Sequence, residues 1–85
     1  MVFLRSLLFC IRVYCSFAKV AREVRIDNLG LSKSLRTEAM QDRLQDRYGA
    51  LLEEATRLSM KDDDAIYYNI LEVAYESAQR RYLKC

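Results

Sequence analysis

The sequence has no proline, no histidine and no tryptophan, and it has only two glycines among 85 residues. A chain with so little glycine and proline cannot supply the turns of an all-β fold, so that class is excluded. Without histidine the chain lacks the most common general base and the most common metal ligand. Its 52% hydrophobic and 31% charged residues exclude a disordered chain. The composition therefore predicts one domain, residues 1–85, with few means for catalysis.

The three cysteines are an odd number, so they cannot all pair within the chain. Cys10 and Cys15 point to different faces of a helix, and no histidine can complete a Cys/His zinc site. We therefore expect three free thiols and no metal site, with Cys10 packed as a small core residue.

Hydrophobic periodicity predicts an all-α fold, a three-helix antiparallel bundle with helices over about residues 2–25, 35–58 and 63–83. Ser32 or Ser34 is expected to cap the second helix, and Ser59 or Asp62 the third. The expected apolar face of the second helix consists of Met40, Leu44, Tyr48, Leu51, Leu52, Ala55 and Leu58. That of the third consists of Ile66, Ile70 and Val73, with Tyr67, Leu71, Ala74 and Ala78 beside them.

The first predicted helix is strongly hydrophobic, with an apolar arc wider than half its circumference. Arg5, Arg12 and Lys19 lie seven residues apart and form one basic stripe. Arg12 would cost about 2.5–3.5 kcal/mol at the centre of a membrane span, so an interfacial or core helix is favoured. The segment is basic and contains no acidic residue before Glu23, like a mitochondrial targeting sequence, and we expect it to remain uncleaved as the first helix.

Charge is unevenly distributed along the chain. Residues 1–36 carry a net charge of +5 and residues 37–64 a net charge of −4. Two interpretations are open: the basic end binds an acidic partner or an anionic surface, or the basic helix lies along the acidic one.

Tyr68, Tyr75 and Tyr82 are also seven residues apart, along the edge of the third helix. These candidate interface aromatics form either the boundary of the core or a contact surface for a partner. No catalytic or phosphate-binding motif is present, and the spaced basic residues do not predict nucleic-acid binding. The functional class that remains is a non-enzymatic one: an adaptor, an assembly factor or an accessory subunit.

The run Phe3-Leu4-Arg5-Ser6-Leu7-Leu8, followed by Arg12, resembles the opening of the LYR-motif proteins, small mitochondrial three-helix proteins. Phe3 and Leu4 stand where that family has Leu and Tyr, and Arg5 matches its arginine. The segment from Arg36 to Tyr48 is loosely similar to the family's middle helix, although it lacks the arginine-rich run that ends in Phe-Arg.

The resemblance implies a mitochondrial protein, in the matrix or associated with the inner membrane, that binds acyl carrier protein. It implies that Arg5 is the motif arginine and that Arg43 and Arg47 contact carboxylate or phosphate groups, with Arg12 as a further basic contact. It also implies that no cofactor is bound directly and that acyl-phosphopantetheine is presented by the partner. The alternative is a supernumerary structural subunit, or a membrane-surface scaffold, of a respiratory or ribosomal complex.

Overall fold

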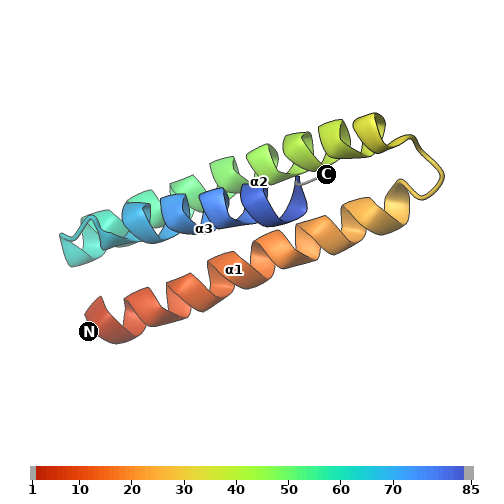
Figure 1. The fold of residues 1–85 in the computed structure, drawn as a ribbon. Helices are drawn as coiled ribbons and strands as arrows, with labels where there is room; N and C mark the ends of the chain where they lie inside the picture. Colours follow the sequence, from red (N-terminus) through yellow and green to blue (C-terminus); the bar gives the residue numbers. More distant parts are fainter. Residues whose placement is uncertain (1, 84–85) are drawn as a thin grey trace.

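The computed structural model describes residues 2–83, which form three helices (Figure 1). They are α1 (Val2–Asp27), α2 (Lys33–Asp62) and α3 (Ile66–Tyr82). Each helix packs against both of the others, and consecutive helices run antiparallel. This confirms the predicted all-α three-helix bundle. The bundle is elongated, 46 Å long and 18 by 17 Å across.

The core consists of one face from each helix. From α1 it contains Phe9, Val13, Phe17, Val20, Ala21 and Val24; from α2 Met40, Leu44, Leu51 and Ala55; and from α3 Tyr67, Leu71, Ala74 and Ala78. The rings of Phe9 and Tyr67 meet edge to face, with centroids 5.5 Å apart. Such a pair contributes about 0.5–1.5 kcal/mol of stability beyond the burial of its area.

The turn between α1 and α2 follows the expected chemistry. Gly30 adopts a φ of 94°, a conformation that is accessible to glycine and strained for other residues. The Ser32 hydroxyl accepts a hydrogen bond from the Leu35 backbone N–H at 3.4 Å. Ser32 is thus the N-cap of α2, one of the two candidates that the sequence offered.

The second turn differs from the prediction. α2 continues to Asp62 instead of ending near Leu58, because no glycine or proline interrupts the segment after Leu58. Asp63 then adopts a left-handed conformation, with φ 52°, which ends the helix. Neither Ser59 nor Asp62 caps α3: its N-cap residue is Ala65, which makes no side-chain cap hydrogen bond. The Asp64 carboxylate accepts from the Ile66 N–H at 3.0 Å.

Several predicted core positions are exposed. Leu52 lies at the surface because the buried stripe of α2 runs through Leu51 and Ala55. Ile66 and Val73 lie at the surface because the buried stripe of α3 is centred on Tyr67 and Leu71. Cys10 is half-buried and Cys15 is exposed, so Cys10 is not the core residue that we expected. Cys85 lies outside the described residues.

The two leucines Leu44 and Leu52 provide a test of this register. Leu44 is fully buried and Leu52 is 36% exposed, although both belong to the apolar pattern of α2. Leu44→Ala is expected to lower the free energy of unfolding by about 2–5 kcal/mol because it leaves a cavity. Leu52→Ala is expected to lower it by less than about 1 kcal/mol. Urea denaturation measures both; equal losses would show that the register is wrong.

Candidate functional site

The outward face of the N-terminal half of α1 is apolar and exposed. We call this surface the α1 strip; it consists of Phe3, Leu4, Leu7, Leu8, Ile11 and Tyr14. Phe3 is 80% exposed, and Leu4 and Leu8 are each 59% exposed. Single exposed leucines are ordinary, but a contiguous apolar patch on a soluble chain usually marks an interaction site.

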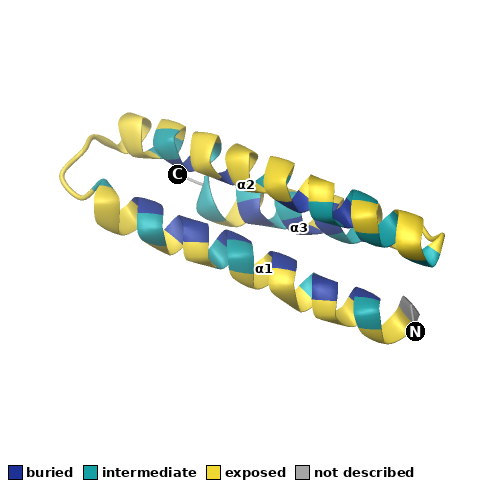
Figure 2. Cartoon of the chain, turned by 180° about the vertical axis from the view of Figure 1, so that it is seen from behind, coloured by how far each residue is buried: buried dark blue, intermediate teal, exposed yellow. Residues whose placement is uncertain are grey.

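The α1 strip lies nearly opposite the core face of the same helix. Ile11 in the strip is two residues from both Phe9 and Val13 in the core, which corresponds to about 160° around the helix axis. Figure 2 shows exposed residues along the outer edge of α1, with buried residues along the edge that faces α2 and α3. Within residues 2–83, therefore, the bundle cannot cover the strip without turning α1 out of the core.

Arg5 connects the N-terminal end of α1 to the other two helices. Its guanidinium donates to the Asp62 carboxylate of α2, with Nη1 and Oδ1 2.5 Å apart. The Tyr67 hydroxyl of α3 donates to the other oxygen of the same carboxylate. We call this group the Arg5–Asp62–Tyr67 clasp. The predicted motif arginine is thus held by an internal partner.

The structure places two of the other predicted arginines in weaker ion pairs. Arg12 on α1 lies 2.9 Å from Glu54 on α2, and Arg43 on α2 lies 3.6 Å from Glu23 on α1. The Arg12–Glu54 pair, like the Arg5–Asp62 pair, joins a cation of α1 to an acid of α2, so the basic helix does lie along the acidic one; the Arg43–Glu23 pair has the opposite polarity. Exposed pairs of this kind contribute about 0–1 kcal/mol, so they could be exchanged for a partner's carboxylates at small cost.

All four predicted arginines line the groove between α1 and α2. Arg5 and Arg12 line a shallow cleft, which is followed by a second cleft lined by Arg12 and Arg47. A third cleft, lined by Arg43 and Arg47, continues the groove. Lys19 joins Arg12 and Arg47 in the middle cleft, whose volume is about 290 Å³. The structure therefore gathers residues that are up to 42 positions apart in sequence into one basic and partly neutralised groove.

The three tyrosines of the predicted stripe make internal contacts. Tyr75 packs on Tyr48 and Phe17, with ring centroids 4.5 and 5.8 Å away. Tyr82 lies beneath the guanidinium of Arg25, 5.6 Å from the centroid of its ring.

The third tyrosine of the stripe, Tyr68, is 37% exposed, and its hydroxyl lies 3.1 Å from that of Thr56. All three tyrosines therefore have the geometry of a core boundary.

The sequence did not predict the contact between Asp62 and Tyr67, which were expected to be a helix cap and an apolar core residue. Tyr67 is fully buried, and its pKa is raised above the ordinary 10.0 by that burial and then by the hydrogen bond to Asp62. A buried tyrosine needs a partner for its hydroxyl, and the only available signal was the nearby run of three aspartates.

Comparison with known proteins yields no relative: no family model matches the chain, nor does any curated protein or solved structure.

Over residues 2–83, no group of three or more thiol and carboxylate side chains is placed to hold a metal ion. None of the described helices is long and apolar enough to cross a membrane. The class defined by the fold is a three-helix bundle with one unusually apolar outer face.

The raised pKa of Tyr67 predicts a loss of stability at alkaline pH. The fold favours the neutral phenol, so this stabilisation is complete below pH 10.0 and is lost as pH rises through the raised pKa. Tyr67→Phe should remove this part of the pH dependence, whereas Tyr68→Phe, at the surface, should retain it. Denaturation followed by circular dichroism from pH 7 to 12 measures the difference. The same pH dependence in Tyr67→Phe and the native chain would contradict the assignment.

Proposed function

We propose that this protein is a non-enzymatic adaptor or accessory subunit that binds a partner protein through the α1 strip. The observation that carries the proposal is the exposure of the strip, with Phe3 and Leu8 80% and 59% exposed on the side away from the core. Burying one such side chain in an interface contributes about 1.5–3 kcal/mol. Aromatic and aliphatic anchors of this kind commonly dominate the affinity of a protein interface.

The α1–α2 groove favours an acidic partner. Arg12, Lys19 and Arg47 lie together in the groove, and Arg12 retains 65% of its side-chain exposure while it is paired with Glu54. Carboxylate or phosphate groups of a partner could pair with these cations while its apolar side chains cover the strip. Among acidic partners, the LYR-like opening of the sequence favours acyl carrier protein, and with it a mitochondrial location.

An acyl chain presented by such a partner would have to enter between the helices. Val13, Leu44 and Leu71 are fully buried, one from each helix, so the centre of the bundle is filled by side chains. Insertion of an acyl chain would therefore require the helices to separate. The proposal of binding at the strip and groove does not depend on that step.

The test compares two double variants that each replace two exposed apolar side chains with serine. Leu8→Ser/Ile11→Ser alters the α1 strip, and Leu29→Ser/Met60→Ser alters exposed apolar residues elsewhere, which are 76% and 79% exposed. Each tagged chain is purified at native levels, and the co-purified acyl carrier protein is quantified by mass spectrometry. We expect the strip variant to lose about tenfold or more of the bound partner, as a loss of at least 1.4 kcal/mol predicts, and the control to retain it.

Circular dichroism must show that both variants are folded to the same extent as the native chain. Equal retention of the partner by the strip variant and the native chain would contradict the use of the strip. If the native chain binds no acyl carrier protein, that partner is wrong, and any protein lost only from the strip variant takes its place.

A second candidate function is a scaffold on a membrane surface or within a larger complex. It is favoured by the exposed cations Arg12, Lys19 and Arg22 of α1 and by the lack of an acidic residue before Glu23. Apolar surface bordered by cations is typical of helices that lie on anionic lipid. Flotation with phosphatidylglycerol vesicles should then be lost in Leu8→Ser/Ile11→Ser and weakened in Lys19→Gln/Arg22→Gln. No flotation of the native chain would exclude the lipid form of this role.

A further inference from the structure

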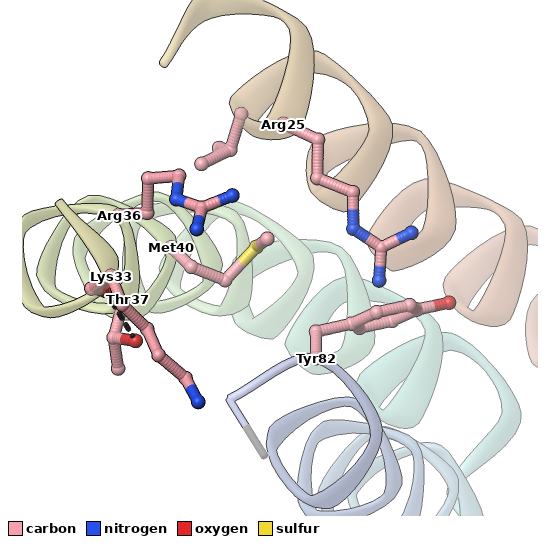
Figure 3. A pocket seen from close by; sticks show the side chains of 7 residues that line it. Arg25, Lys33, Arg36, Thr37, Met40 and Tyr82 are labelled. Carbon is pink, nitrogen blue, oxygen red and sulfur yellow. Dashed lines mark hydrogen bonds between the residues drawn. The ribbon is translucent and has the colours of Figure 1, made fainter. Parts of the chain in front are cut away.

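A cationic cleft lies at the end of the bundle away from the clasp. α3 ends at Tyr82, whereas the last turn of α1 and the first turns of α2 continue beyond it (Figure 1). Beside the end of α3, a cleft of about 180 Å³ lies between α1 and α2. Figure 3 shows that its walls carry Arg25 from α1, Lys33 and Arg36 from α2, and Tyr82 from α3.

The cations of this cleft differ from those of the α1–α2 groove because none of the described residues that line the cleft is acidic. The ion pairs formed within the described chain involve Arg5, Arg12 and Arg43 and none of the three cleft cations. In Figure 3 the guanidinium groups of Arg25 and Arg36 extend from the two helices over the gap, with Met40 between them.

Two further features raise the positive potential of the cleft and fix its shape. Lys33 is the first residue of α2, whose first turn contains no acidic residue, so the positive end of the helix dipole adds to the side-chain charges. Arg25 is positioned by its contact with the face of Tyr82, 5.6 Å from the ring centroid.

The floor of the cleft is apolar. Val24 and Met40 are 1% and 5% exposed, and the ring of Tyr82 forms one wall. A ligand that fits would carry an anionic group toward the cations and a small apolar or aromatic group toward this floor.

We propose that this cleft binds the phosphate monoester group of a ligand whose adjoining part is apolar. Arginine pairs with phosphate oxygens through two parallel hydrogen bonds, and two arginines with one lysine match a dianionic phosphate better than a single carboxylate. The cleft is distinct from the α1 strip, so this proposal stands or fails independently of the proposed function.

Phenyl phosphate is a suitable probe because it joins a dianion to an aromatic ring; phenyl sulfate has the same shape with one charge. Binding is followed by amide chemical shifts in the full chain at pH 7.5. We expect phenyl phosphate to shift the amides of residues 33–37 and 25, and to bind more tightly than phenyl sulfate. Equal affinity for the two probes, or shifts spread over all basic surfaces, would overturn the proposal.

Matched variants separate a site from general attraction to a basic chain. Arg25→Gln/Lys33→Gln/Arg36→Gln removes the cleft cations, and Arg57→Gln/Lys61→Gln/Arg80→Gln removes the same charge from exposed positions outside the cleft. The cleft variant should bind phenyl phosphate about tenfold more weakly or worse, since charge-assisted hydrogen bonds are lost. The control should bind like the native chain; equal weakening in both variants would overturn the proposal.

Vesicles identify the source of the phosphate monoester. If the ligand is a lipid headgroup, vesicles with phosphatidic acid should bind the native chain and the control variant but not the cleft variant. If it is a soluble phosphate ester, phenyl phosphate should bind while the vesicles do not discriminate between the variants. Failure of the native chain to bind either probe would overturn the proposal.

Discussion

A single carboxylate, that of Asp62, accepts hydrogen bonds from both of the other helices. Arg5 reaches it from α1 and Tyr67 from α3, at the end of the bundle where α2 turns into α3. Asp62 is 9% exposed, and a carboxylate so far removed from water needs charged and hydrogen-bonding partners. Together with the core packing of α1, the clasp holds one rotation of this helix about its own axis. With that rotation set, Phe9 and Val13 face the core and Leu8 and Ile11 face outward.

This rotation determines how the excess of apolar residues in α1 is divided. A three-helix core of this size receives one face of α1, and the opposite face remains as the α1 strip. The clasp also changes the role of Arg5, which resembles a motif arginine in the sequence but serves the internal structure here. Arg12 and Arg47 in the α1–α2 groove are more accessible to an acidic partner than Arg5.

The sequence was sufficient to predict the features that depend on local periodicity and capping. It predicted three helices and the buried positions Met40, Leu44, Leu51 and Ala55, and it included Ser32 as a cap. It was not sufficient where a distant residue decides the outcome. The clasp depends on a contact between residues 57 positions apart. The end of α2 is set by the left-handed conformation of Asp63, which no glycine marks in the sequence. Helical periodicity also could not show which part of the wide apolar arc of α1 faces the bundle, so Cys10 was wrongly expected in the core.

The central claim is that a partner covers the α1 strip. Hydroxyl-radical footprinting of the isolated chain and of the complex purified at native levels tests it most directly, because it reports the exposure of individual side chains. If a partner covers the strip, Phe3, Leu8, Ile11 and Tyr14 become strongly protected in the complex, while Leu29 and Met60, which are 76% and 79% exposed outside the strip, react as before. Unchanged reactivity of the strip in the complex would contradict the account.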